Sequence, residues 1–178
     1  MNLTGRRVFL AAPYSQWVNP ATGLVDEHRR TCLDALRVSF IAAGARVFSA
    51  HHNERWGAGW LPAEECTPAD FRAMRVADVV CAIVGSPPSG GVAVELGWAS
   101  ALAKPVLVVK APDSACTPLI DGLGSITRTA YLTDDGVWGE RFFAEALALI
   151  ATIADADPVD SPHECAESAF VGHVEGRA

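Results

Sequence analysis

The feature that most constrains the fold is the alternation of short apolar runs with longer segments of helical periodicity. Runs that suit strands lie at 7–12, 46–50, 78–84 and 105–109, with a weaker one at 129–132. Segments that suit helices lie at 25–43, from 67 onward, at 92–103, at 118–123 and at 138–154. This alternation predicts an α/β fold with an open, mostly parallel, doubly wound sheet of about five strands and helices on both faces.

Local signals indicate where two of the helices begin or end. Gly44 is expected to end the first helix, because glycine readily adopts the left-handed conformation found after a last helical turn. Thr67 is a candidate N-cap, Pro68 suits a first turn, and Asp70 follows three residues after Thr67. We therefore expect the second helix to start at Thr67.

The length of 178 residues fits one domain, which we assign to residues 1–154. Residues 155–178 are polar and acidic, with six acidic residues and one arginine, and so carry −5 of the net charge of −7. We expect this tail to be mostly disordered. The remaining domain is nearly neutral and has no basic stripe, which argues against nucleic-acid binding.

The sequence also bears on the cellular compartment and on metals. No apolar stretch is long enough to span a bilayer, and the short apolar run after the first arginines suits a core strand better than a signal peptide. The five cysteines include no CxxC pair, and we expect a reduced, cytoplasmic protein in which Cys81 is a core residue. The histidines and cysteines lack zinc spacing, so we expect no metal and no cofactor.

Polar and aromatic residues gather where the predicted strands end, which is where open parallel sheets bind ligands. Those that follow the first three strands are Tyr14, Ser15, His51, Trp56, Ser89 and Gly91. Asp70 and Glu95 lie in what we expect to be the first turns of the next helices. Two carboxylates from different segments are thus predicted to face one crevice.

Each of these features also has a purely structural interpretation. Glu95 stands among small and apolar residues, where a carboxylate is costly without a role, but a glutamate near a helix start also complements the helix dipole. Asp70 fits a capping pattern equally well. The loop at 85–91 can offer backbone N–H groups to an anion, but it is neither a Walker loop nor a complete GxGxxG fingerprint. Trp17, Trp56 and Trp60 can cover a ring or pack the loops.

Taken together, the motifs resemble those of the nucleoside 2-deoxyribosyltransferase superfamily. Asp70 is followed by Ala77–Asp78 and an apolar strand, and a G-x-x-x-E-x-G pattern runs from Gly91 through Glu95 to Gly97. The resemblance covers about residues 7–125 and implies a Rossmann-like or flavodoxin-like sheet.

Two hydrolase branches of that superfamily look most similar. They are the deoxynucleoside 5′-monophosphate N-hydrolases and the CMP or hydroxymethyl-CMP N-glycosidases of nucleoside-antibiotic pathways. The second branch matches better, through Pro13–Tyr14, residues 19–23, the 50–57 segment with His51, Glu54 and Trp56, and residues 95–105.

The resemblance implies roles for individual residues. Glu95 is similar to the nucleophile that attacks C1′ of the sugar, and Asp70 to the acidic residue that contacts sugar hydroxyls or transfers a proton. Tyr14 is similar to the aromatic residue beside the nucleophile. Ser89 matches a serine that binds the 5′-phosphate, and Gly91 would let the backbone approach that phosphate. Thr117 is aligned with a serine lent by the neighbouring subunit of a homodimer that shares its active site.

One departure concerns the phosphate. The related hydrolases carry an arginine just after the first strand, where this chain has Ser15 and Gln16. A bidentate charged partner for a phosphate is therefore missing there. The substrate is either a nucleoside or a nucleotide whose phosphate is held by Ser15, His52 and the start of the helix that carries Glu95.

Three functions remain open from the sequence. The first is hydrolysis of the N-glycosidic bond of a nucleoside 5′-monophosphate, such as CMP or a related pyrimidine nucleotide, through a covalent glycosyl-enzyme intermediate. The second is base exchange by a nucleoside 2-deoxyribosyltransferase. The third is a non-catalytic nucleotide-binding module. The incomplete glycine fingerprint disfavours an oxidoreductase.

Overall fold

The computed structural model describes residues 2–155, which form a five-stranded sheet in the order β2-β1-β3-β4-β5 with every neighbouring pair parallel. The strands are β1 (Arg7–Ala11), β2 (Arg46–Phe48), β3 (Val79–Ile83), β4 (Val106–Lys110) and β5 (Thr129–Thr133). The predicted α/β sheet is confirmed, with each strand within two residues of its expected bounds. The acidic tail from residue 156 lies outside the described residues.

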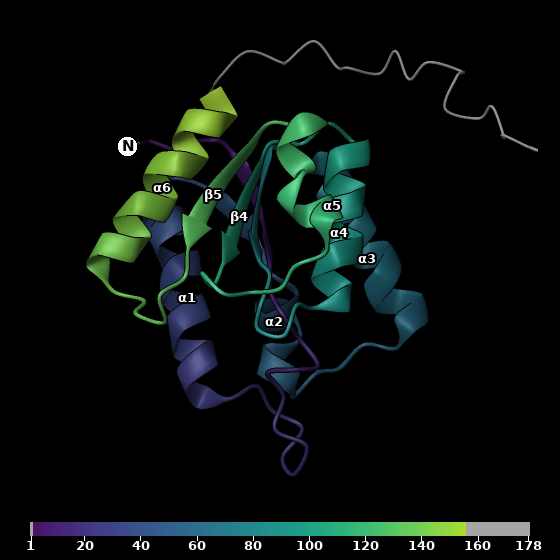
Figure 1. The fold of residues 1–178 in the computed structure, drawn as a ribbon. Helices are drawn as coiled ribbons and strands as arrows, with labels where there is room; N and C mark the ends of the chain where they lie inside the picture. Colours follow the sequence, from purple (N-terminus) through teal and green to yellow (C-terminus); the bar gives the residue numbers. More distant parts are fainter. Residues whose placement is uncertain (1, 156–178) are drawn as a thin grey trace, which may run out of the picture.

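Helices cover both faces of the sheet (Figure 1). On one face lie α1 (Glu27–Ala42) and α6 (Glu140–Asp155), and on the other lie α3 (Ala63–Val76), α4 (Gly90–Ala101) and the short α5 (Pro118–Asp121). Alternate residues of the strands point to opposite faces, so each face has its own apolar cluster. In β3, Cys81 packs beneath α1 and α6, whereas Val80 and Ala82 pack beneath α3 and α4.

The segment between β2 and α3 is more ordered than the sequence indicated. It contains α2 (Ala50–Asn53) and a 3-10 turn, η1 (Arg55–Gly57), where we expected a long loop. Another short 3-10 turn, η2 (Leu123–Ser125), precedes β5. Figure 1 shows α2 beyond the carboxyl ends of the strands, at the edge where ligands bind in such sheets.

The predicted start of α3 was wrong. The helix begins at Ala63, four residues before Thr67, and Pro68 lies inside it. Glu64 and Glu65 occupy the true first turn, where acidic side chains favour the positive end of the helix dipole. Pro68 removes one backbone hydrogen bond near this end, which the helix tolerates. Asp70 therefore projects from the second turn and is not a capping residue.

At the amino ends of the strands, Asp78 pairs with Arg7. The Asp78 carboxylate accepts hydrogen bonds from Arg7 Nη2 (2.8 Å), Arg7 Nε (3.1 Å) and the Arg7 backbone N–H (2.7 Å). These interactions hold the pKa of Asp78 below its ordinary value. The predicted structural role of Asp78, away from the ligand-binding edge, agrees with this geometry.

None of the helices within residues 2–155 is both long and apolar enough to cross a membrane.

Candidate active site

A pocket of about 330 Å³ opens beyond the carboxyl ends of β1 and β3. The chain leaves β1 toward β2 on one side, and β3 lies on the other, so this is the topological switch point of the sheet. The polar and aromatic side chains that line it are those of Tyr14, Ser15, His51, Glu54, Trp60, Cys66, Thr67, Asp70, Ser89, Glu95 and Trp98. The predicted crevice thus exists, and it brings Asp70 and Glu95 into one pocket.

Glu95 and Asp70 reach this pocket from neighbouring helices. Glu95 lies in the second turn of α4, one turn later than expected, because α4 begins at Gly90 rather than Val92. Asp70 projects from α3, which packs against α4. Both residues are partly buried, and both carboxylates interact electrostatically. This arrangement resembles the paired carboxylates that enzymes use for acid, base and nucleophilic roles.

Burial disfavours the charged form of both carboxyl groups. It raises the pKa of Glu95 to about 8, with a further contribution from the charge of Asp70. It raises the pKa of Asp70 to about 6, with a further contribution from the charge of Glu54. At pH 7 the pair therefore holds one proton. One carboxyl group can act as an acid while the other acts as a nucleophile.

Glu54 is a third carboxylate in the pocket and was not among the predicted site residues. It ends α2 and is only 6% exposed. Its backbone oxygen accepts hydrogen bonds from the N–H groups of Gly57 (3.2 Å) and Gly59 (2.9 Å). Glu54 belongs to the 50–57 segment that carried the family resemblance, and this resemblance was the available signal for its place in the pocket.

A strained turn holds Glu54 in place. Arg55 and Trp56 both have left-handed backbones, with φ of 52° and 59°. Such a conformation costs about 1 kcal/mol or more for a residue with a side chain. Gly57 follows with φ of 101°, and a Cβ there would lie 2.3 Å from the Gly23 carbonyl oxygen. Contacts with the 19–25 loop therefore fix the path of the chain directly after Glu54.

Aromatic rings form one wall of the pocket. The Tyr14 ring stacks on His51, with centroids 4.5 Å apart, and meets Trp60 at the same distance in a tilted arrangement. The Nε2 atom of His51 donates a hydrogen bond to the Pro13 carbonyl oxygen at 3.0 Å, and burial lowers the pKa of His51 to about 4. His51 is therefore neutral near pH 7 and serves as a flat, fixed surface.

The Tyr14 hydroxyl is buried in this wall and has no hydrogen-bond partner within residues 2–155. Burial, followed by the charge of nearby Glu54, raises the pKa of Tyr14. The hydroxyl and the Glu54 carboxylate thus interact electrostatically without the geometry of a complete hydrogen bond. A ligand can satisfy both groups.

Ser89 and Gly91 place the start of α4 at the pocket. Ser89 is the N-cap, and its Oγ accepts a hydrogen bond from the Val92 N–H at 3.5 Å. A Cβ on Gly91 would meet only Ser89 Oγ, at an ordinary 3.8 Å, so the packing of the protein itself does not require glycine there. The absence of a side chain leaves the first N–H groups of α4 open to an anion.

Trp56 and Trp60, which both lie between β2 and α3, occupy different surroundings. Trp56, which we expected to contact the substrate, does not line the pocket. It packs against the core beneath α1 and α6, and the Arg30 guanidinium lies 5.9 Å from its ring centroid. Trp60 takes the place at the pocket and remains 51% exposed. Ser15 lines the pocket as expected, and His52 does not.

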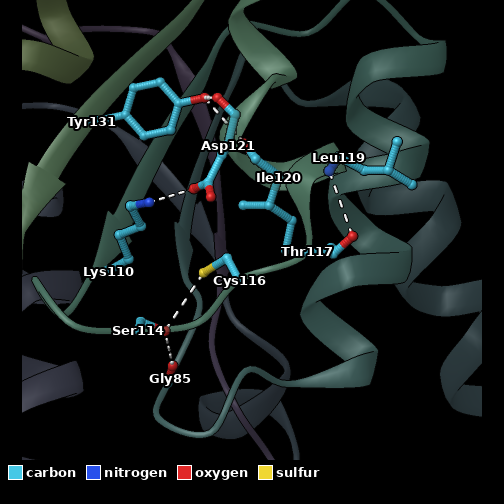
Figure 2. Close-up of polar contacts among 9 residues, drawn as sticks. All are labelled: Gly85, Lys110, Ser114, Cys116, Thr117, Leu119, Ile120, Asp121 and Tyr131. Carbon is cyan, nitrogen blue, oxygen red and sulfur yellow. Dashed lines mark hydrogen bonds and ion pairs between the residues drawn. The ribbon is translucent and has the colours of Figure 1, made fainter.

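Thr117 lies away from the pocket of its own chain. It caps α5, where its Oγ1 accepts a hydrogen bond from the Leu119 N–H at 3.5 Å (Figure 2). The Tyr131 hydroxyl donates to the Asp121 carbonyl oxygen at 2.9 Å, and Lys110 pairs with the Asp121 carboxylate. These contacts fix α5 to β4 and β5, and Thr117 stays exposed.

Among the described residues, the carboxylates of the pocket are not balanced by lysine or arginine. Within the part of the chain that the structure describes, no lysine or arginine lines it, whereas Glu54, Asp70 and Glu95 do. Among the same residues, no group of three histidine, cysteine or acidic side chains is arranged to hold a metal ion. The pocket therefore suits a ligand that offers hydrogen-bond donors or develops positive charge.

Comparisons with known proteins agree with this geometry. The model of the nucleoside 2-deoxyribosyltransferase family matches residues 8–154. The solution structure of BlsM is similar, with 36% sequence identity, a TM-score of 0.72, and coverage of 88% of this chain and 98% of BlsM. A comparison with curated protein sequences finds no match.

Two further solved structures share the fold. The Clostridium botulinum CMP N-glycosidase BcmB is 25% identical over 81% of this chain and 98% of its own, with a TM-score of 0.60. A 2-deoxyribosyltransferase from Bacillus psychrosaccharolyticus is 20% identical over 86% of this chain and 98% of its own, with a TM-score of 0.58. At 20% identity, the similarity to the 2-deoxyribosyltransferase supports the fold alone.

Proposed function

Because this chain belongs to the nucleoside 2-deoxyribosyltransferase family, we propose that it hydrolyses the N-glycosidic bond of a nucleoside 5′-monophosphate. The products are a free base and ribose 5-phosphate, and a pyrimidine nucleotide such as CMP is the proposed substrate. The observation that carries the proposal is the pair Glu95 and Asp70, which share one pocket and one proton near pH 7. Similarity to a CMP N-glycosidase supports this choice of substrate.

The reaction proceeds in two steps at C1′ of the sugar. Breakage of the C1′–N bond leaves its electron pair on the base and builds positive charge at C1′. The ionised Glu95 carboxylate stabilises that charge and bonds to C1′, while Asp70 gives its proton to the departing base. Water then attacks C1′, its proton returns to Asp70, and the Glu95 carboxylate is released with ribose 5-phosphate.

The positive charge that develops at C1′ also accounts for how Glu95 ionises. Positive charge at C1′ favours the carboxylate form of Glu95, so the shared proton moves to Asp70 as the transition state forms. The high pKa of Glu95 in the free enzyme is therefore compatible with a nucleophilic role.

The phosphate is assigned to the start of α4. The N–H groups at Gly90 and Gly91, the Ser89 hydroxyl and the positive end of the helix dipole supply the binding groups. Ser15 faces the same pocket and can donate a further hydrogen bond. The scheme uses no arginine, and none of the described residues that line the pocket is an arginine.

The quaternary structure proposed for this enzyme is a homodimer in which each subunit lends Thr117 to the other's site. Thr117 is exposed and lies outside its own pocket, which a role in trans requires. Gel filtration combined with an activity assay tests this. A fully active monomer would remove Thr117 from the site.

The direct test is a panel of nucleotides and nucleosides, assayed for free base by chromatography with Glu95→Ala as the control. We expect pyrimidine nucleoside monophosphates to release base with the wild-type protein only. Ligand-induced stabilisation without base release from any compound would instead indicate a non-catalytic binding module.

Base exchange is the second candidate, and the family itself favours it. In that reaction a second base, rather than water, attacks the glycosyl-enzyme intermediate. Incubation with a nucleotide and a different free base separates the two reactions. Formation of a new nucleotide in place of ribose 5-phosphate would replace the hydrolase proposal with a transferase.

A further inference from the structure

Glu54 is a buried carboxylate for which the proposed reaction has no use. Its side chain lines the pocket, is nearly fully buried and lies beside the Tyr14 hydroxyl, whose pKa it raises. No lysine or arginine of the described chain lines this pocket to balance it. A buried charge without a partner is unfavourable, so a donor is expected to arrive with the ligand.

The position of Glu54 assigns it to the base rather than to the sugar or phosphate. The phosphate-binding groups and Glu95 both come from α4, whereas Glu54 comes from α2 beyond β2. Glu54 lines the same pocket as the rings of Tyr14, His51 and Trp60, which form the aromatic wall, and its charge acts on the Tyr14 hydroxyl. A nucleotide with its phosphate at α4 and its C1′ beside Glu95 extends its base toward that wall.

Next to the Glu54 carboxylate lies a donor that lacks an acceptor, the buried Tyr14 hydroxyl. The two groups together present an acceptor beside a donor. The edge of cytosine presents the complement, since its exocyclic N4 amino group donates and its N3 atom accepts.

We propose that Glu54 accepts a hydrogen bond from the exocyclic amino group of cytosine while Tyr14 donates to N3, so that the enzyme selects cytosine over uracil nucleotides. Uracil carries a carbonyl oxygen where cytosine carries the amino group, and that oxygen would face the carboxylate. Its one ring N–H near this edge is flanked by two carbonyl oxygens, so Glu54 cannot accept that proton without repulsion from both.

This inference rests on the proposed function for the placement of the nucleotide, and the test keeps the two apart. Binding of CMP and of UMP is measured by calorimetry on the Glu95→Gln protein, with and without Glu54→Gln. Rates of base release from both nucleotides are measured on proteins that retain Glu95. Glu65→Gln, a change at an exposed carboxylate in the first turn of α3, is the matched control.

Glu54→Gln is expected to lower the preference for CMP over UMP by about tenfold or more, in binding and in kcat/KM, because its amide can donate to the uracil oxygen. Glu54→Asp keeps the charge and is expected to keep a cytosine preference, which guards against a folding defect in the glutamine variant. Glu65→Gln is expected to change neither ratio.

The outcomes separate the two proposals. If Glu54→Gln weakened the binding and kcat/KM of CMP and UMP equally, or changed neither, base recognition by Glu54 would be overturned while the proposed hydrolysis stands. Preferential CMP binding that depends on Glu54, without base release by the wild-type protein, would overturn the proposed hydrolysis and leave base recognition standing. Failure of both nucleotides to bind would overturn both.

Discussion

Carboxylates at the two ends of the sheet lie in opposite electrostatic surroundings. At the amino ends, Asp78 accepts three hydrogen bonds from Arg7, and its pKa is lowered. At the carboxyl ends, no lysine or arginine within residues 2–155 lines the pocket beside Asp70 and Glu95, and burial raises their pKa values to about 6 and about 8. Pairing makes the first carboxylate a stabilising element. Lack of pairing leaves the other two able to exchange protons and react.

The largest expected effect is on the rate of base release, at the carboxyl ends of the strands. Glu95→Gln removes the proposed nucleophile while keeping the shape of the side chain, so base release should fall by about a thousandfold or more. The rate of base release at pH 7 is the measurement. Glu64→Gln, at an exposed position of α3, is the control and should keep the wild-type rate. Retention of a tenth of the activity in Glu95→Gln would exclude a nucleophilic Glu95.

The proton shared by Asp70 and Glu95 predicts a bell-shaped dependence of kcat/KM on pH. Below about pH 6 both carboxyl groups are protonated and no nucleophile is available, and above about pH 8 both are ionised and no proton reaches the base. The maximum should lie near pH 7.

Asp70→Asn tests the source of that proton. The rate should fall by about a hundredfold or more, and the alkaline limb should disappear. The remaining limb should report the ionisation of Glu95 alone, at a pH below 8, because the charge of Asp70 no longer raises the pKa of Glu95 while burial still does. An alkaline limb that persists in Asp70→Asn would point to another proton donor.

Stability should respond to the raised pKa of Glu95 in a pH-dependent way. Its pKa is about 8 in the folded protein against an ordinary 4.5, so the folded state binds the extra proton between these values and stability falls as pH rises through them. Glu95→Gln should therefore raise the unfolding midpoint at pH 8, by about 2–4 °C for each kcal/mol gained, and leave it unchanged at pH 4. Thermal unfolding from pH 4 to pH 9 measures this. A lower midpoint at pH 8 would contradict the desolvation of Glu95.

The smallest expected effect lies at the opposite end of the sheet. The pKa of Asp78 is lowered, so its contribution is present above its ordinary value of 3.8 and is lost as pH falls through the folded value. Asp78→Asn should lower the midpoint at pH 7 by only about 1–4 °C, because solvent screens the partly exposed pair. The difference should vanish in strong acid. If Asp78→Asn raised the unfolding midpoint at pH 7, the contrast between the two ends of the sheet would not hold.

Much of the fold could be predicted because strand and helix periodicities are local properties of the sequence. The runs around Cys81 and Val108 are apolar on both faces, which indicates central parallel strands, and both strands are central. The start of α3 could not be predicted in this way. Thr67 and Pro68 are strong start signals, yet the helix begins four residues before Thr67, at Ala63, with Glu64 and Glu65 in its first turn.

The candidate site was predictable only in part. Glu95, Asp70 and Tyr14 were found because their sequence motifs place them after strands that end at one edge. Trp56 and Trp60 are four residues apart in the same loop, and no local signal says which faces the pocket. The left-handed turn at Arg55 and Trp56 decides this, since it directs Trp56 into the core.

The sequence by itself determined the parallel sheet, the edge at which the site lies and the helices that carry Asp70 and Glu95, because these follow from periodicity and from the rule that such sheets bind ligands at their carboxyl ends. Only the tertiary structure decided the protonation of the pocket and the presence of Glu54 in it. The pKa values of the carboxyl groups are set by burial and by the distances between charges. Both depend on segments that are far apart in the chain.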